Sequence, residues 1–155
     1  MAKRSERVEV DGREVTITNP DKLYWPDEGL TKRDLISYYR GVAPLILPYL
    51  VDRPESLHRF PNGIHAESFF QKDVAGQVPD WAQTITLGAE DDPEEYLLCQ
   101  DEATLVVMAN MGCIEVNPWN SRRQNLNNPD YLVIDLDPAT GRPIRIDCTK
   151  LGSGA

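Results

Sequence analysis

Two aspartates near the end of the chain have the type and spacing of metal ligands. Asp135 and Asp137 close the apolar run YLVIDLDP, and residues two apart in a strand project from the same face. Two carboxylates so close repel each other unless a cation lies between them, and Mg²⁺ or Mn²⁺ with substrate phosphates suits such a pair. Pro138 cannot join a hydrogen-bonded ladder, so it predicts the strand's end at an open edge. A solvated turn after a strand has the same pattern, so these residues alone leave both interpretations open.

Several basic residues early in the chain have the surroundings of a phosphate site. Lys22 follows the turn sequence Asn-Pro-Asp, and Arg59 precedes the turn sequence Phe-Pro-Asn-Gly. Lys32 and Arg33 stand where a helix is expected to begin. A helix N-terminus that carries a lysine beside loop amides can hold a phosphate. Taken singly, each of these residues also fits an ordinary solvated surface.

Aromatic and polar residues in the middle of the chain are further candidates. Phe69 and Phe70, followed by Lys72, lie next to each other and so face opposite sides of a strand. One of the rings can then be core while the other stacks on a nucleic-acid base, although burial of both fits equally well. Asn117 stands where the chain leaves an expected strand.

Composition excludes several classes of protein. The chain has 155 residues with 16 basic and 25 acidic side chains, a net charge of −9, which rules out a nucleic-acid binder that works by bulk positive charge. The run Gly88–Glu102 holds seven of the acids and no base, so a basic patch can still form in the first third. The three cysteines lack a C-x-x-C pair and fit a reducing compartment. Without an apolar leader or membrane-length run, we expect a cytoplasmic, nucleoid-associated protein with no membrane contact.

The elements that position these residues can be predicted from local patterns. The fold class expected is α+β, with a mixed or antiparallel sheet and two main helices. A hairpin turns at Asp11-Gly12, a helix runs from Thr31 to Leu50 with a kink or stop near Val42 caused by its prolines, and a second helix runs from Asp101 to Met111. Further strands are expected at Ser56–Phe60, Ser68–Gln71, Thr84–Leu87, Tyr96–Cys99, Cys113–Val116 and Tyr131–Leu136.

The same patterns predict the core and one exposed region. The acidic stretch Gly88–Glu95 is expected to form an exposed loop away from any DNA path. The predicted core consists of apolar residues from the helices and strands: Leu35, Tyr39, Val42, Leu57, Phe60, Leu105, Met108, Ile114, Val116, Val133 and Ile134.

Six blocks occur in an order that resembles the polymerase domain of bacterial ligase D, in the archaeo-eukaryotic primase-polymerase superfamily. They read TNPDKLYWP, GLTKRDLISYYRGVAPLILPYL, RPESLHRFPNGI, SFFQKD, ATLVVMANMGCIEV and YLVIDLDP. The resemblance covers residues 18–138 and implies the N-terminal half of that domain. We therefore expect residues 1–138 to form this half and residues 139–155 to be a short, partly disordered C-terminal extension.

The resemblance implies a role for each candidate residue. Asp135 and Asp137 look like the first two metal-binding carboxylates of the catalytic centre, and Lys22 and Lys32 look like the pair that grips a DNA 5′-phosphate. The residues that resemble those contacting DNA or template are Arg59, Phe69, Phe70 and Lys72. Asn117 stands at a nucleotide-site position where the family usually has histidine, and His58 stands where some relatives carry lysine.

The implied function is template-directed nucleotidyl transfer at DNA ends in non-homologous end joining, with Mg²⁺ or Mn²⁺. The chain ends eighteen residues after Asp137, and the family's third carboxylate and nucleotide-phosphate motif have no counterpart, so we expect the site to be catalytically incomplete alone. The expected partners are 5′-phosphorylated DNA ends, a second polypeptide supplying the remainder, a ligase and an end-binding protein. The alternatives are a non-catalytic binder of 5′-phosphorylated ends and a truncated remnant without activity.

Overall fold

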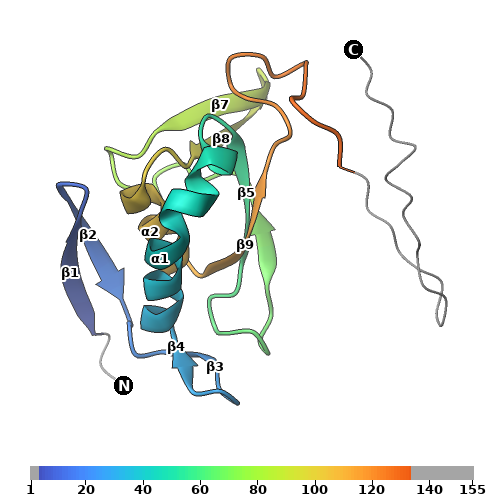
Figure 1. The fold of residues 1–155 in the computed structure, drawn as a ribbon. Coiled ribbons are helices and arrows are strands. Elements are labelled where there is room, and N and C mark those ends of the chain that lie inside the picture. The colour runs from blue at the N-terminus through green and yellow to red at the C-terminus, as the bar shows by residue number, and fades with distance from the viewer. Residues whose placement is uncertain (1–3, 134–155) are drawn as a thin grey trace, which may run out of the picture.

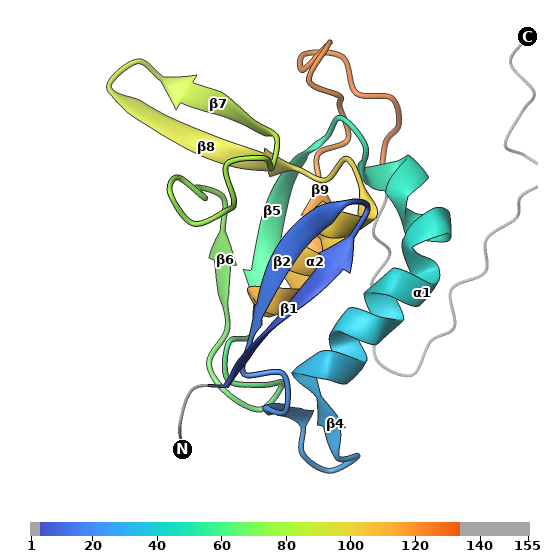
Figure 2. The ribbon, with the colours of Figure 1, turned by 90° about the vertical axis from the view of Figure 1, so that its left-hand side faces the viewer.

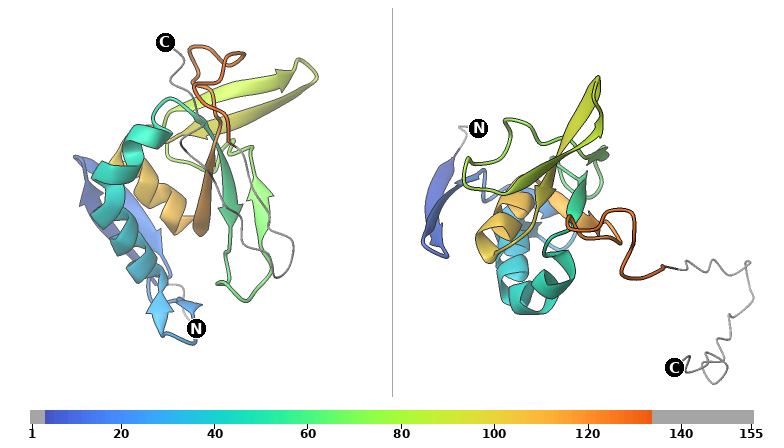
Figure 3. Two further views of the ribbon diagram at one scale, coloured as in Figure 1. Left: turned by 45° about the vertical axis from the view of Figure 1, so that its right-hand side comes forward. Right: turned by 90° about the horizontal axis from the view of Figure 1, so that it is seen from above.

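Two helices lie between a β-hairpin and a larger antiparallel sheet in the computed structural model, which describes residues 4–133 (Figures 1 and 3). The hairpin consists of β1 and β2, and the sheet has the order β6-β5-β8-β7 with β9 paired to β5. In chain order the elements are β1 Ser5–Val10, β2 Arg13–Thr18, β3 Leu23–Trp25, β4 Leu30–Thr31, α1 Lys32–Leu50, β5 Pro54–Arg59, β6 Phe69–Gln71, β7 Thr84–Ala89, β8 Asp92–Leu98, α2 Glu102–Asn110 and β9 Cys113–Pro118. The predicted α+β class is confirmed.

The N-terminal hairpin forms where its turn sequence predicts. Asp11 and Gly12 have φ values of 51° and 72°, the left-handed pair that a two-residue hairpin turn requires. Alternation then places Val10, Val15 and Ile17 on the buried side. Next along the chain, β3 and β4 form a short antiparallel ribbon at the foot of α1, which the sequence did not predict.

Helix α1 begins as predicted and then continues through both of its prolines. Thr31 is the N-cap, and its side chain and that of Asp34 form a capping box. The predicted interruption near Val42 is wrong, since the helix extends unbroken to Leu50. Pro44 and Pro48 both lie on the exposed side, so the carbonyls that lose their hydrogen bonds can be solvated by water.

Helix α2 lies at the centre of the molecule, between the hairpin and the sheet (Figure 3). All residues from Ala103 to Ala109 are buried, as expected for a helix that is apolar on every side. The predicted N-cap is confirmed, because the Asp101 carboxylate accepts hydrogen bonds from the backbone N–H and the hydroxyl of Thr104. The helix is followed by Gly112, with φ of 85°, where a Cβ would lie 2.9 Å from the Tyr24 hydroxyl oxygen.

Strand β5 organises the sheet because it pairs with three other strands, all of them antiparallel. It pairs with β8 at Pro54–Glu55, with β6 at Leu57–Arg59, and with β9 along its other edge. Residues 88–95 differ from expectation: they belong to the hairpin β7–β8, which projects from the body of the protein (Figure 2). Glu90, Asp91 and Asp92 are exposed at the tip of this hairpin, while the partly buried carboxylates of Glu94 and Glu95 accept hydrogen bonds from the hydroxyl groups of Tyr96 and Thr84.

Most of the predicted core is buried: Leu35, Tyr39, Leu57, Phe60, Leu105 and Met108. Val42, Ile114 and Val116 are partly buried. Val133 is 62% exposed, which contradicts the prediction, and Tyr131–Val133 are not in a strand because the chain has left the sheet by then. Ile134 and the rest of the predicted strand Tyr131–Leu136 lie outside the described residues. Within residues 4–133, neither helix combines the length and apolar character needed to cross a membrane.

Candidate functional site

Lys22 and Lys32 are joined directly through the backbone. The N–H of Lys32 donates to the carbonyl of Lys22 at 2.8 Å, and the N–H of Arg33 donates to the carbonyl of Pro20 at 2.9 Å. These bonds use two of the backbone donors that every helix leaves free at its N-terminus. The turn at residues 19–22 is therefore attached to the start of α1, and the side chains of both lysines extend from neighbouring points of the backbone.

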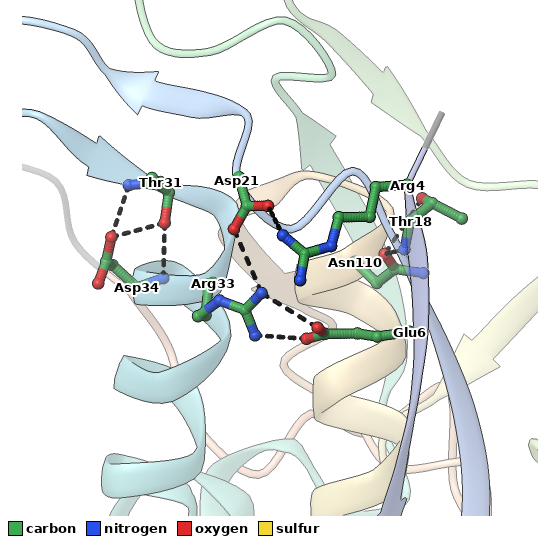
Figure 4. Close-up of polar contacts among 8 residues, drawn as sticks. All are labelled: Arg4, Glu6, Thr18, Asp21, Thr31, Arg33, Asp34 and Asn110. Atoms are coloured by element: carbon green, nitrogen blue, oxygen red, sulfur yellow. Dashed lines mark hydrogen bonds and ion pairs between the residues drawn. The ribbon is translucent and has the colours of Figure 1, made fainter. Parts of the chain in front are cut away.

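A network of ion pairs holds this junction against the N-terminal hairpin (Figure 4). Arg33 lies between the carboxylates of Glu6 and Asp21, and Arg4 pairs with the same Asp21 at 2.8 Å. Exposed pairs contribute little individually, but these connect β1, the turn and α1 to one another. The network thus fixes the backbone from which the two lysines project.

Each lysine side chain is anchored on oxygen atoms from other parts of the fold. The Lys32 Nζ donates to the backbone carbonyl of Asn110 at 2.7 Å and lies 3.4 Å from the Thr18 hydroxyl, and the residue is only 5% exposed. The Lys22 Nζ donates to the Pro61 carbonyl and the Asn62 side chain, both at 2.6 Å. The sequence analysis did not identify Asn110 and Asn62 as members of the site. For Asn62, its position in the turn after β5 could have indicated that it lies near the basic residues, whereas nothing in the sequence marks Asn110.

The cluster carries unbalanced positive charge. Burial, Lys22 and Arg59 together lower the pKa of Lys32 to about 8. Burial is the largest cause, and the two neighbouring cations add to it. A bound anion would relieve this repulsion, so the arrangement is suited to a phosphate group.

Arg59 connects the cation cluster with the first of the two phenylalanines. Its Nε donates to the Met111 carbonyl at 2.8 Å, and its Nη1 donates to the Gln71 side chain. The guanidinium carbon lies 5.2 Å from the centre of the Phe69 ring, a cation–π arrangement. The structure therefore brings together Lys22, Lys32, Arg59 and Phe69.

The remaining candidates lie on the other face of the sheet. Phe70 pairs with His58, while Phe69 pairs with Arg59, so the adjacent phenylalanines face opposite sides as predicted. Neither is core, since Phe69 is 44% and Phe70 63% exposed, so both predicted alternatives for their burial are wrong. Both rings belong to β6, an edge strand of the sheet, where Phe69 lies against Arg59 and Phe70 lies against His58.

Asn117 and Lys72 also belong to this second surface. Asn117 is exposed and pairs with Ser56 in β5, which places it on the same face as His58. Lys72 is exposed and follows the last residue of β6. The predicted site residues are thus divided between two faces, with β5 as the common element.

The predicted metal ligands Asp135 and Asp137 lie outside the described residues. Within residues 4–133, no group of three or more His, Cys, Asp or Glu side chains is placed to hold a metal ion. The metal site remains a prediction from the sequence.

Comparison with known proteins identifies relatives over most of the chain. A family model described as "LigD, primase-polymerase domain" matches residues 31–149. The chain is 38% identical over 142 residues to the multifunctional non-homologous end joining protein LigD of Pseudomonas aeruginosa, covering 88% of this chain and 16% of the relative. It is 33% identical over 135 residues to the LigD of Mycobacterium tuberculosis (strain H37Rv), covering 82% and 18%.

The fold has a solved counterpart. The polymerase domain from Mycobacterium tuberculosis ligase D, a structure in complex with DNA, superposes with a TM-score of 0.66 and 33% identity over 70% of this chain and 38% of that chain. The chain spans less than a fifth of the length of these two curated relatives. On the family match and the similarity in sequence and structure, the chain belongs to the primase-polymerase domain family of ligase D.

Proposed function

We propose that this chain is the DNA-end-binding part of an end-joining repair polymerase of the ligase D type. In this proposal, Lys22 and Lys32 hold the 5′-phosphate of a DNA end. The observation that carries it is the set of three neighbouring cations, in which Lys32 is buried and its positive charge is disfavoured by Lys22 and Arg59. A phosphate at this position supplies the missing negative charge.

The surrounding residues support a nucleic-acid ligand in particular. Phe69 lies against Arg59 with its ring partly exposed, and such a ring next to a phosphate-binding cluster can stack on a base. Phe70 and Lys72 offer a second aromatic and cationic surface on the opposite face. The names of the relatives, which place them in non-homologous end joining, agree with DNA ends as the ligand.

Nucleotidyl transfer is the further activity that the family suggests. It would use Asp135 and Asp137 to hold Mg²⁺ or Mn²⁺, which neutralises the triphosphate and orients it for displacement. In our proposal this chemistry requires the remainder of the polymerase domain, because the chain matches only 38% of the solved polymerase domain of Mycobacterium tuberculosis ligase D, and a ligase and an end-binding protein act on the same DNA. The end-binding role has the stronger support, because the contacts that bring Lys22, Lys32 and Arg59 together are observed.

Binding to a gapped duplex with and without a 5′-phosphate tests the proposal. We expect the phosphate to raise affinity about tenfold, equivalent to one charge-assisted contact of about 1.4 kcal/mol, as measured by fluorescence anisotropy at low salt. Lys22→Ala should remove this preference. Arg7→Ala is the matched control. This substitution also removes one positive charge, but Arg7 lies in an exposed ion pair with Glu14 on the N-terminal hairpin. Equal affinity for both duplexes would rule out the end-binding role.

A separate assay tests catalysis. Primer extension with Mn²⁺ and ribonucleotides should require the added remainder of the domain and should be abolished by Asp135→Ala. Extension that survives Asp135→Ala would place the activity elsewhere. Circular dichroism of each variant controls for loss of the fold.

A further inference from the structure

Tyr24, the middle residue of β3, is buried between two turns that come from other parts of the chain. Only 1% of the residue is exposed, although β3 is a three-residue strand at the foot of the molecule (Figure 1). One turn follows β5 and comprises residues 60–64, and the other joins α2 to β9 and comprises residues 110–112. We call them the β5 turn and the α2 turn.

The β5 turn is folded onto the backbone of Tyr24. The N–H of Ile64 donates to the Tyr24 carbonyl at 2.8 Å. Gly63 has a φ of 94°, and a Cβ at this position would lie 3.0 Å from the Tyr24 carbonyl oxygen. Glycine therefore permits the turn to approach the β3 backbone closely.

The α2 turn is folded onto the side chain of Tyr24. A Cβ on Gly112 would lie 2.9 Å from the Tyr24 hydroxyl oxygen and 3.3 Å from the Phe60 main chain. The Phe60 N–H donates to the Gly112 carbonyl at 2.7 Å, which joins the two turns. Burial raises the pKa of Tyr24 to about 12, so the hydroxyl stays neutral in this position. Tyr24 thus contacts one turn through its backbone and the other through the end of its side chain.

These two turns carry the main-chain oxygen atoms that hold the three cations of the phosphate-binding cluster. Each cation donates to a carbonyl in one of the turns: Lys22 to Pro61 in the β5 turn, and Lys32 to Asn110 and Arg59 to Met111 in the α2 turn. Carbonyl oxygens accept hydrogen bonds without carrying a charge. The turns therefore fix the three cations in place and leave their positive charge available to an anion.

We propose that Tyr24 is a positioning residue of the phosphate-binding cluster, because it sets the separation of the two turns to which Lys22, Lys32 and Arg59 are attached. A binding site needs its groups held to within about 0.5 Å of the productive geometry. This inference rests on the proposed function for the identity of the ligand. It adds that Tyr24 acts on the phosphate through the two turns, without contacting it.

Gly112→Ala tests the contact between the tyrosine hydroxyl and the α2 turn. The added methyl group overlaps the hydroxyl oxygen, so the turn must shift and carry the acceptors of Lys32 and Arg59 with it. We expect the preference for a 5′-phosphorylated duplex, measured by anisotropy, to fall from about tenfold to about twofold. Gly76→Ala is the matched control, because Gly76 has a similar φ of 66° but no atom within 4 Å of a Cβ at that position. It should keep the full preference.

Tyr24→Phe separates this contact from general damage to the fold. Phenylalanine keeps the ring and removes the hydroxyl oxygen, so alone it should retain most of the preference. Combined with Gly112→Ala, it should restore the preference to about fivefold, because the overlapping atom is gone. It should not restore Gly63→Ala, whose Cβ would lie against the backbone carbonyl of Tyr24. A double variant of Gly112 and Tyr24 that binds no better than Gly112→Ala would overturn the inference.

A second measurement involves no DNA. NMR titration of the lysine side chains follows the pKa of Lys32, which burial lowers to about 8 in the natural protein. Displacing the α2 turn in Gly112→Ala should expose Lys32 to water and move this pKa toward 10.5, whereas Gly76→Ala should leave it unchanged. Circular dichroism checks that each variant is folded. Tyr24→Leu, which removes the end of the ring, replaces Gly112→Ala in both measurements if the latter does not fold, and it should have the same effects.

The positioning role and the proposed function can fail separately. If the natural protein binds both duplexes equally, while the pKa of Lys32 rises in Gly112→Ala and returns on addition of Tyr24→Phe, the end-binding function is wrong and the positioning role stands. If the natural protein prefers the phosphorylated duplex, but Gly112→Ala changes neither this preference nor the pKa of Lys32, the end-binding function stands and the positioning role is wrong.

Discussion

The guanidinium of Arg53 is hydrogen-bonded to the carboxylate of Asp130, 77 residues further along the chain. Arg53 is only 2% exposed, and it also donates to the Trp119 carbonyl at 3.1 Å and lies 4.8 Å from the centre of the Tyr131 ring. One buried side chain thus ties both ends of the segment after β9 to the start of β5. In the sequence that segment comes shortly before Asp135 and Asp137, so Arg53 fixes the last part of the described chain that precedes them.

Replacing Arg53 should destabilise the fold. Arg53→Lys keeps the charge but loses the planar group that reaches both Trp119 and Asp130, so we expect a loss of about 2 kcal/mol in the free energy of unfolding. Urea denaturation followed by circular dichroism measures this. Arg123→Lys is the control, because Arg123 makes a more exposed pair with Asp52 and should change stability by less than about 0.5 kcal/mol. Equal losses in the two variants would contradict the anchoring role of Arg53.

Stability should depend on pH through Glu55. Glu55 is fully buried, its carboxyl oxygens have no hydrogen-bond partner among the described residues, and burial raises its pKa well above the usual range. The folded protein then holds a proton that the unfolded chain releases above about pH 4.5, so stability falls as the pH rises above that value. Glu55→Gln has no charge to bury and should gain stability relative to the natural protein between about pH 5 and about pH 7.5.

The measurement is urea denaturation of both proteins at each pH. Glu9→Gln, a substitution on the exposed side of β1, serves as the control and should show no comparable gain. A difference between Glu55→Gln and the natural protein that stays constant with pH would disprove a protonated Glu55.

Binding of a 5′-phosphate should weaken in alkaline solution. Because the pKa of Lys32 is lowered to about 8, the side chain loses its positive charge as the pH rises through that value, and the phosphate loses a partner. The advantage of phosphorylated over unphosphorylated duplex should therefore shrink between about pH 7 and about pH 9, while Lys32→Arg should retain it because guanidinium stays charged. An advantage that is constant over this range would show that Lys32 does not contact the phosphate.

Titration of Lys32 also affects folding, in the opposite direction. Its pKa in the folded protein lies below the unfolded value of 10.5, so between about pH 8 and 10.5 the unfolded chain binds more protons and this residue's contribution to stability rises with pH. Lys32→Met should flatten that rise in urea denaturation experiments. An unchanged rise would assign the effect to another group.

The cap of α2 should be important for stability. Asp101 accepts two hydrogen bonds from Thr104 and pairs with Arg13 in the N-terminal hairpin at 2.7 Å, so Asp101→Ala should cost about 1–2 kcal/mol. Asp91→Ala, at the turn of the exposed hairpin β7–β8, should cost less than about 0.5 kcal/mol. Thermal unfolding of the two variants compares them, and a similar loss in both would argue against the cap.

Local signals in the sequence predicted the parts of the fold that depend on neighbouring residues. Asp11-Gly12 defines its hairpin, and Thr31 and Asp101 each begin a helix, because turns and caps are made within a few residues. The effect of Pro44 and Pro48 was not predictable in the same way, since it depends on whether the freed carbonyls face water or the core. The predicted strands at Thr84–Leu87 and Tyr96–Cys99 extend further toward each other than expected, into residues 88–95, because cross-strand pairing outweighs the acidic composition there.

Contacts between distant segments explain what the sequence could not reveal about the site. Lys32 was a candidate from its position at a helix start, but its partner Asn110 is 78 residues away. His58 was noted as a departure from the family, whereas its contact with Glu115, 57 residues away, arises only when β5 and β9 pair. Asn110 and Glu115, which make these contacts, belong to no sequence motif that would mark them as members of a site.

The hydrogen bond from the Lys32 N–H to the Lys22 carbonyl also closes residues 23–31 into a loop whose two ends meet. A segment closed at its base can gain or lose residues at its tip without altering the spacing of the residues at the closure. Insertions at the exposed tip of the β3–β4 ribbon should therefore be tolerated in later versions of this protein, whereas the buried Tyr24 at its base, which accepts a hydrogen bond from the Ile64 N–H, keeps the backbone next to Lys22 in place.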